Sequence, residues 1–342
     1  MISFVQRRAE REVNKTMAYN NIISRTDAAA LIPEDVSREI IKTVPQQSAV
    51  MSLARRLPNM SQGQKRLPVM SALPVAYFVT GDTGMKQTSE VNWDDKYIDA
   101  EELAVIIPIP EAVLDDTDYD IWGEIRPSIE EAFGKAFDAA VLHGTNAPSS
   151  WPSDIATAAA AASHSVDLST QVAAGEDLYD VLLGESGVIS LIEADGFMAN
   201  GHVAALSMRG KLRGVREKVY DGSSTANLGM PIFTRSMQDG NRYELDGSPI
   251  YFPKNGSINA SSVLQFSGDW SQLVYSMRQD ITYKILTEAV IQDGAGNIVY
   301  NLAQQDMIAL RAVMRLGWQL PNPINRVNET EATRYPFSIL VP

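Results

Sequence analysis

The clearest hydrophobic pattern in the chain lies between residues 119 and 143, where apolar residues recur at every fourth position. The row consists of Ile121, Ile125, Ile129, Phe133, Phe137 and Val141. This spacing predicts a helix over 119–143. Because a turn takes 3.6 residues, the row drifts by about 40° per step, so we expect the two ends to face different neighbours. Pro127 either kinks one helix or begins a second helix, and we favour a single kinked helix that Gly144 ends.

Alternation of apolar and polar residues predicts strands elsewhere. The longest alternation has Arg311 and Arg315 on its polar face, and its apolar positions are Ile308, Leu310, Ala312, Met314, Leu316, Trp318 and Leu320. A period of two predicts a half-buried strand over 308–320. We also predict strands at 101–109, 203–207, 281–285 and 298–300, and helices at 177–183 and 188–195. Strands and helices mixed in this way indicate an α+β fold.

Residues 58–100 form a different kind of segment. Strand-like pieces at 66–70 and 75–80 precede a turn at 81–84 and a polar stretch over 85–92. This pattern predicts a long β-hairpin or loop with little core of its own, and two strands alone in water are only marginally stable. The segment nevertheless carries four large aromatic side chains: Tyr77, Phe78, Trp93 and Tyr97. We therefore predict that a neighbouring subunit buries these residues, and Trp93 in particular.

The N-terminal segment has the character of an arm. Residues 1–25 carry five cations and two acids, a net charge of +3, and Val5, Ala9, Val13 and Met17 recur at a spacing of four. A helix this short is marginal in isolation, so we expect it to fold only against a partner or the body of the protein. Val5, Val13 and Met17 are thus further candidates for a subunit interface. Pro45 ends a possible short helix over the residues that follow Pro33.

Composition removes several classes of function. The 342 residues include 29 Lys and Arg against 42 Asp and Glu, a net charge of −13 that disfavours a generally basic nucleic-acid-binding protein. The absence of cysteine excludes disulfides, thiolate zinc sites, iron–sulfur clusters and cysteine nucleophiles. We find no stretch of 18 apolar residues, which disfavours a membrane span, and no signal-peptide core, so we expect an intracellular protein.

Candidate chemistry is sparse. His143, His164 and His202 match no zinc-ligand spacing. The best metal candidate is the acidic run over 111–120, but we favour capping of the following helix by these carboxylates. Its members are Glu111, Asp115, Asp116, Asp118 and Asp120. We therefore predict no catalytic, cofactor-binding or metal-binding residue.

A basic stretch over 209–218 remains to be explained. Its cations are Arg209, Lys211, Arg213, Arg216 and Lys218, and we expect them on a helix. They meet either nucleic acid or acidic surfaces of neighbouring subunits. We favour the subunits, since no aromatic residues that could stack on bases are interleaved with the cations.

Taken in order, several segments resemble one family. They are 31–37, 65–69, 103–110, 139–145, 268–273 and 306–311, which read LIPEDVS, KRLPV, LAVIIPIP, AAVLHGT, GDWSQL and DMIALR. No single segment is specific, but their order and spacing over residues 30–325 are similar to those of major capsid proteins of tailed double-stranded DNA bacteriophages. These proteins have the Hong Kong 97-type capsid fold.

The resemblance implies a division of the chain. Residues 1–57 would be an N-terminal arm and 58–100 an extended loop. Residues 101–147 and 263–303 would form a peripheral domain with the spine helix 119–143, and 148–262 with 304–342 an axial domain.

The resemblance also implies a function. Such subunits form hexamers and pentamers that close an icosahedral shell around the genome, without sequence-specific DNA binding and without a membrane. Portal, scaffolding and decoration proteins are possible partners. The protein would be made in the cytoplasm of the bacterial host and located in the virion. Lys65, Lys86 and Lys96 lie in the loop, but we do not predict cross-linking.

Two alternatives stay open. An encapsulin-like protein compartment has the same fold and encloses a different cargo. A metal-dependent hydrolase that uses residues 111–120 is the alternative from another class, and monomers with a bound divalent ion would support it.

Overall fold

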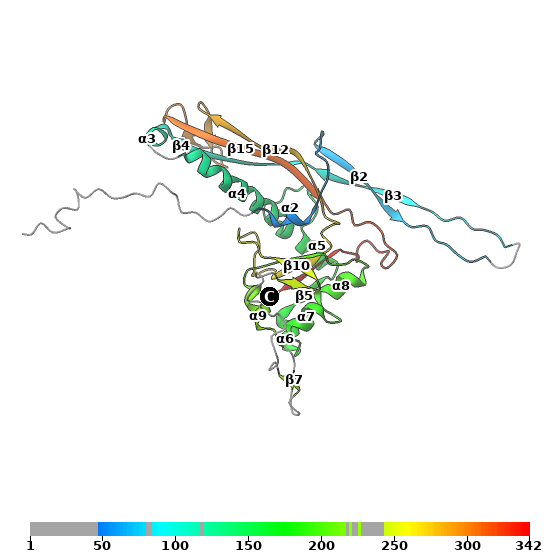
Figure 1. Cartoon of the computed structure of the whole chain (residues 1–342). Helices are drawn as coiled ribbons and strands as arrows, with labels where there is room; N and C mark the ends of the chain where they lie inside the picture. Colours follow the sequence, from blue (N-terminus) through cyan, green and yellow to red (C-terminus); the bar gives the residue numbers. More distant parts are fainter. Residues whose placement is uncertain (1–46, 80–83, 117–119, 217–218, 221–224, 227–242) are drawn as a thin grey trace, which may run out of the picture. The chain divides into compact units, whose positions relative to one another are not determined.

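The computed structural model describes residues 47–79, 84–116, 120–216, 219–220, 225–226 and 243–342 (Figure 1). Helices and strands alternate along these residues, which confirms the α+β class. The expectations for Val5, Val13, Met17 and the short helix before Pro45 lie outside the described residues. Within the described part, none of the helices is both long and apolar enough to cross a membrane.

The first sheet contains the longest strands. Its order is β1 (Arg55–Arg56), β12 (Val274–Leu286), β15 (Met307–Gln319) and β4 (Glu101–Pro110). Strands β12, β15 and β4 are antiparallel, whereas β1 joins β12 in parallel. The strand expected over 308–320 is thus confirmed as β15, and it lies in the middle of the sheet (Figure 1).

The second sheet is built from shorter strands. Its order is β5 (Ser165–Asp167), β16 (Phe337–Val341), β11 (Gln265–Gly268), β6 (Gly201–Ala204), β10 (Ser248–Tyr251) and β9 (Glu244–Leu245). Helices α5 (Ile155–Ala161) and α8 (Val188–Ala194) contact β16. Helices α6 (Leu168–Ala173), α7 (Leu178–Leu183) and α9 (Met208–Gly214) complete this part of the chain. Three further pairs of strands are β2 (Gln64–Ala72) with β3 (Asn92–Asp99), β7 (Val219–Tyr220) with β8 (Thr225–Ala226), and β13 (Val290–Gln292) with β14 (Ile298–Asn301).

The long helix is α4 (Ile121–His143), a single helix that contains Pro127. The alternative interpretation, in which a second helix begins at Pro127, is therefore wrong. Asp120 caps α4 by accepting a hydrogen bond of 3.0 Å from the Gly123 amide. Gly144 ends it in the left-handed conformation, with φ of 64°, as the sequence predicts. The short helix α3 (Glu111–Asp116) precedes it.

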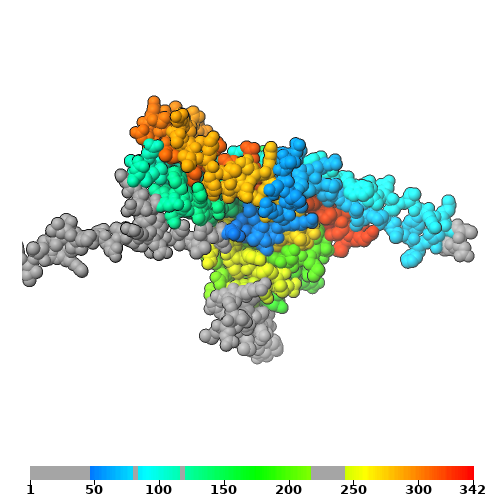
Figure 2. Space-filling view, turned by 45° about the horizontal axis from the view of Figure 1, so that its top comes forward, coloured from blue at the N-terminus to red at the C-terminus, as the bar shows by residue number. Residues whose placement is uncertain are grey.

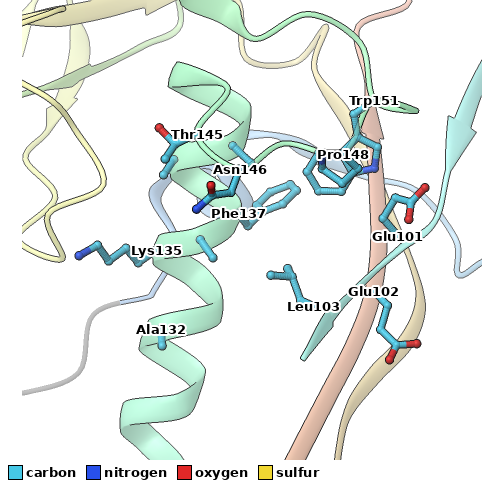
Figure 3. A pocket seen from close by; sticks show the side chains of 13 residues that line it. Glu101, Glu102, Leu103, Ala132, Lys135, Phe137, Thr145, Asn146, Pro148 and Trp151 are labelled. Carbon is cyan, nitrogen blue, oxygen red and sulfur yellow. The ribbon is translucent and has the colours of Figure 1, made fainter. Parts of the chain in front are cut away.

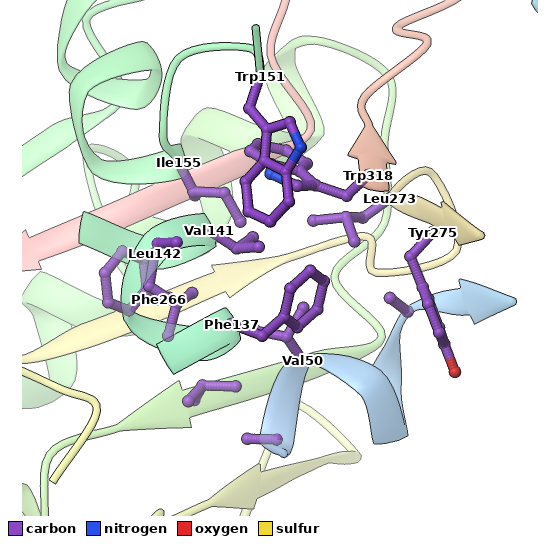
Figure 4. Close-up of a cluster of buried hydrophobic side chains, with 14 of the residues drawn as sticks. Val50, Phe137, Val141, Leu142, Trp151, Ile155, Phe266, Leu273, Tyr275 and Trp318 are labelled. Carbon is purple, nitrogen blue, oxygen red and sulfur yellow. The ribbon is translucent and has the colours of Figure 1, made fainter. Parts of the chain in front are cut away.

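The main core lies along the second half of α4. Phe137 is fully buried and meets Trp151 edge-on, with 6.0 Å between the ring centres (Figure 4). Val141 and Leu142, one turn further on, are fully buried as well. Towards the first half of the helix, the Arg126 guanidinium lies 5.5 Å from the centre of the Tyr283 ring on β12. The two ends thus have different neighbours, which the drift of the apolar row explains.

Helix α2 (Ala49–Leu53) packs on α4 through an unusually close contact. Asp138 of α4 is fully buried and accepts hydrogen bonds from the amides of Ala49 at 3.0 Å and Val50 at 3.1 Å. Burial raises the pKa of Asp138, while these bonds favour its charged form. At Gly134 a Cβ atom would lie 3.2 Å from the Ser48 nitrogen, so a small residue is needed there. One turn of α4 therefore holds residues 48–50 against the helix.

The sheets group the segments differently from the expected division. Strand β15 falls within 304–342, yet it pairs with β4 and β12, which lie in 101–147 and 263–303. Strand β11 falls within 263–303, yet it pairs with β6 and β16. The boundaries at 263 and 304 thus separate each of these strands from the strands to which it is hydrogen-bonded. This happens because each sheet takes strands from distant parts of the chain.

Other expectations have mixed outcomes. The helices expected at 177–183 and 188–195 are confirmed as α7 and α8, and the strand expected at 66–70 is the middle of β2. The strand expected at 75–80 is wrong, since residues 75–79 form no strand. The strand expected at 203–207 ends at Ala204 and begins earlier, at Gly201.

Candidate assembly interface

Strands β2 and β3 form an antiparallel ribbon whose register defines two faces. Met70 pairs with Trp93, and Arg66 pairs with Tyr97. Directly opposed residues point to the same side of an antiparallel pair, and successive residues alternate. One face therefore carries Trp93, Asp95 and Tyr97, which we call the outer face, and the other carries Ile98 and Lys96.

The second face attaches the ribbon to the rest of the chain. Ile98 is fully buried together with Met60 and Val274. Lys96 forms an ion pair with Glu331, with 2.7 Å between Nζ and Oε1. A Cβ atom at Gly317 of β15 would collide with the Asp99 carbonyl, so glycine allows the end of β3 to cross close to β15. The base of the ribbon is thus held by its own chain.

The outer face has no such cover within the described residues. The Trp93 side chain is 63% exposed, and Tyr97 and Tyr77 are 40% exposed. Arg66 and Asp95 form an ion pair of 3.3 Å on this face, and both are largely exposed. Figure 2 shows that the loop, in cyan, borders the red C-terminal segment and extends beyond it. An exposed face with large aromatic side chains is typical of an interaction surface.

Beyond the paired residues of β2 and β3, hydrogen bonds still connect the two sides of the loop. The Val75 amide donates to Ser89 Oγ over 2.8 Å, and the Tyr77 hydroxyl donates to the Gln87 carbonyl. Phe78 follows directly and is fully exposed, at 104%. Met85, on the opposite limb, is 86% exposed and was missed by the sequence analysis, which treated 85–92 as polar. Met85 is an isolated apolar residue in a polar stretch, and this pattern could have marked it as a further interface candidate.

A pocket of about 440 Å³ lies against the second half of α4 (Figure 3). Four alanines of the helix line it, together with Leu103 of β4 and the rings of Phe137, Pro148 and Trp151. Glu101 and Glu102 stand on one rim, and Lys135 stands on the other side of the helix face (Figure 3). Thr145 and Asn146 add polar groups to the lining, so the pocket is mostly apolar inside and charged at its edge.

The histidines have structural roles. Within the described residues, no group of three or more His, Asp or Glu side chains could hold a metal ion. His202 is fully buried, its Nδ1 lies 2.9 Å from Ser267 Oγ, and burial lowers its pKa to about 4. His164 Nε2 lies 3.1 Å from Asp195 Oδ2, and Asp195 also accepts a hydrogen bond from the Tyr335 amide. His143 Nε2 accepts a hydrogen bond of 3.1 Å from the Asn259 amide.

The acidic run and the basic stretch also support the fold. Asp120 caps α4, as the preferred interpretation of the acidic run expected. In the basic stretch, the Arg209 guanidinium lies 5.0 Å from the centre of the Tyr243 ring and 5.5 Å from that of Phe252. Lys211 and Arg213 are exposed on α9. Part of the stretch is therefore used within the chain, and Lys218 lies outside the described residues.

Comparison with known proteins agrees with an assembly role. The profile of the phage capsid family matches residues 28–324. The major capsid protein of Staphylococcus phage 80alpha is 27% identical over 307 residues, which cover 87% of this chain and 84% of that protein. A solved chain from Microbacterium phage Oxtober96 is 34% identical with a TM-score of 0.78, and one from Mycobacterium phage Bobi is 33% identical with a TM-score of 0.76. Each alignment covers 94% of this chain and 99% of the solved chain.

The family match spans most of the chain and includes the ribbon, α4 and the strands of the first sheet. The solved relatives match over nearly their whole length, so the fold is that of phage capsid proteins. The chain therefore belongs to the phage capsid family, and it is a structural subunit of the capsid shell of a virion and not an enzyme.

Proposed function

We propose that this subunit assembles into hexamers and pentamers that close an icosahedral shell around a double-stranded DNA genome. The observation that carries the proposal is the outer face of the β2–β3 ribbon. Its aromatic residues are exposed although the rest of the chain has a well-filled core. Since an exposed ribbon of two strands is marginal in water, a neighbouring copy that covers the outer face gives it its stability.

The candidate interface residues follow from this proposal. Tyr77, Phe78, Trp93 and Tyr97 contact a neighbouring subunit through the extended loop, which we assign to residues 58–100. In the N-terminal arm, Val5, Val13 and Met17 provide a second contact. Around a ring, each subunit inserts its loop against one neighbour and is contacted by the loop of the other neighbour. Such heterologous contacts repeat until the ring closes.

The remaining segments form two domains in this proposal. The sheet β1–β12–β15–β4 with α4 is the peripheral domain. The sheet β5–β16–β11–β6–β10–β9 with its helices is the axial domain, at the centre of each hexamer or pentamer. This division supersedes the boundaries at 263 and 304, because it follows the hydrogen-bonded sheets.

The charge supports a container without sequence-specific DNA binding. A net charge of −13 for each subunit repels phosphate groups, so the shell wall apart from the arm is neutral or acidic on its inner surface. In this proposal the protein is made in the cytoplasm of the bacterial host. Portal, scaffolding and decoration proteins are its further partners.

Electron microscopy of the purified protein, with an assay of the particle contents, tests the proposal. We expect closed icosahedral particles, and particles from infected cells should contain double-stranded DNA. Particles that contain an enzyme and no genome would instead identify an encapsulin-like compartment. Stable monomers at high protein concentration would contradict the assembly proposal altogether.

A further inference from the structure

Phe78 lies in the outer part of the extended loop, far along the chain from the pocket beside α4. The β2–β3 ladder and the two hydrogen bonds at Val75–Ser89 and Tyr77–Gln87 hold both limbs together (Figure 1). An extended chain rises about 3.3 Å per residue, so the twelve steps from Gln87 to Asp99 span about 40 Å. Phe78 lies beyond Tyr77, whereas the pocket beside α4 begins at Glu101, directly after the base of the ribbon. An intramolecular contact between Phe78 and this pocket is therefore excluded.

The pocket, in turn, has room for a side chain that none of the described residues supplies. Its volume of about 440 Å³ exists because Ala132, Ala136, Ala139 and Ala140 present only methyl groups along one face of α4. Leu103 and Trp151 form the walls and Phe137 the floor (Figure 3). Apolar walls with a few charged groups at the rim are typical of sites that bind an aromatic anchor.

We propose that the pocket of one subunit receives Phe78 from the loop of a second copy of the chain. This inference rests on the proposed assembly function and names the receptor for the loop. Phe78 is the most exposed large apolar side chain of the described residues, and burial in the pocket removes its ring from water.

Charge fixes the orientation of this contact. Lys86 lies next to Gln87, so it sits across the loop from Phe78. On the pocket rim, Glu102 already pairs with Arg315, with 2.8 Å from Nε to Oε2. Glu101 accepts a hydrogen bond of 2.6 Å from the Ser150 hydroxyl and has no ion-pair partner among the described residues. Glu101 is thus the carboxylate that meets Lys86 when Phe78 enters the pocket. Lys135 points to the opposite side and does not oppose this approach (Figure 3).

Cross-linking in assembled particles tests the contact directly, because the chain has no cysteine of its own. The variant with both Phe78→Cys and Ala136→Cys is assembled and treated with a short bis-maleimide. We expect covalent multimers on a denaturing gel, and only monomers from either single variant. A pair with Gln292→Cys in place of Ala136→Cys is the matched control and should remain monomeric.

Assembly measurements give a second, independent test. Ala136→Leu fills the pocket, and Ala112→Leu adds the same atoms at an exposed position of α3. We expect Ala136→Leu and Phe78→Ala each to raise the protein concentration needed for assembly at least tenfold, and Ala112→Leu to leave it unchanged. Because both variants remove the same contact, the double variant should be no worse than the more severe single variant.

The outcomes separate this inference from the proposed function. Normal shells that yield no multimers from the Phe78→Cys and Ala136→Cys pair would overturn the pocket contact and leave the shell function intact. Multimers from Val5→Cys paired with Ala136→Cys, and none with Phe78→Cys, would show that the arm occupies the pocket and would also overturn it. Failure of the wild-type chain to form shells would instead contradict the proposed function.

Discussion

Helix α4 and the β2–β3 ribbon both carry large aromatic residues at regular positions, but only the helix buries them within the chain. Phe137 of α4 has no exposed surface, whereas Phe78 of the loop is 104% exposed. The helix has the first sheet and α5 as neighbours, so its apolar face meets a second layer. The ribbon meets its own chain on the opposite face, through Ile98, the Lys96–Glu331 ion pair and a hydrogen bond of 3.2 Å from the Ile324 amide to the Met70 carbonyl. Its outer face stays exposed.

This contrast separates two uses of the same residue type. A phenylalanine in α4 stabilises the fold, and its loss should be seen in the isolated subunit. A phenylalanine or tryptophan in the extended loop contributes when another copy covers it, and its loss should be seen only on assembly. The following predictions test this distinction.

The largest effect is expected from Phe137→Ala. Removal of a fully buried phenylalanine leaves a cavity between α4, Trp151 and Tyr275, and it should lower the free energy of unfolding by about 3–5 kcal/mol. Chemical denaturation of the unassembled subunit measures this loss. Phe78→Ala is the matched control, because the same change in the loop should leave unfolding unaltered. Wild-type unfolding of Phe137→Ala would contradict the role of α4 in the core.

We expect a pH dependence of the free energy of unfolding from His202, a buried residue of β6, and not from the ribbon. The pKa of His202 is lowered from 6.5 to about 4 by burial, so the unfolded chain binds a proton more readily than the folded chain between these values. Stability should therefore fall as the pH drops through this window, by about 3 kcal/mol for this residue.

Unfolding curves at pH 7 and pH 4 for the wild type and His202→Gln measure this contribution. His143, whose pKa is also lowered, and Asp138, whose pKa is raised, are present in both proteins, so the difference reports His202 alone. An equal loss of stability on acidification in the two proteins would contradict the assignment.

Trp93→Ala should act on assembly alone. If the neighbouring copy covers the outer face, the variant should lose about 2 kcal/mol or more of association free energy at each subunit contact, as expected of a hot-spot tryptophan. Circular dichroism should show a normally folded subunit, and sedimentation should show incomplete assembly at concentrations at which the wild type forms shells. Unfolding of the isolated Trp93→Ala subunit, or normal shells, would each count against the proposed interface.

The smallest effect is expected at the start of α4. Asp120→Ala removes the hydrogen bond to the Gly123 amide and should lower the free energy of unfolding by about 1 kcal/mol. Asp95→Ala, on the outer face of the ribbon, is the control and should change it by less than about 0.5 kcal/mol, because its ion pair with Arg66 is exposed. Equal losses of unfolding free energy in Asp120→Ala and Asp95→Ala would contradict the view that helix residues stabilise the isolated subunit more than ribbon residues do.

The sequence predicted elements better than it predicted how they combine. The spacing of four from Ile121 to Val141 predicted α4 almost to the residue, and the alternation around Trp318 predicted β15, because both signals are local. Which distant strands share a sheet, such as β15 with β4 or β11 with β16, could not be predicted, since hydrogen bonding between distant strands leaves no local pattern.

The assignment of the interface residues stays a prediction. Tyr77, Phe78, Trp93 and Tyr97 were singled out because they occur in a segment without enough residues for a core, and they are exposed in the structure. The pocket beside α4 could not be predicted, because alanines at Ala132 and Ala136 are ordinary helix residues in the sequence. Their significance appears only when Leu103, Pro148 and Trp151 enclose the space around them.

Hydroxyl-radical footprinting of unassembled subunits and of purified shells tests most directly whether a neighbouring copy covers the ribbon. The account predicts that Phe78 and Trp93 are oxidised in the subunit and protected in the shell. Phe137 and Trp318, which are buried within the chain, should be protected in both states. Equal oxidation of Phe78 and Trp93 in subunit and shell would contradict the account.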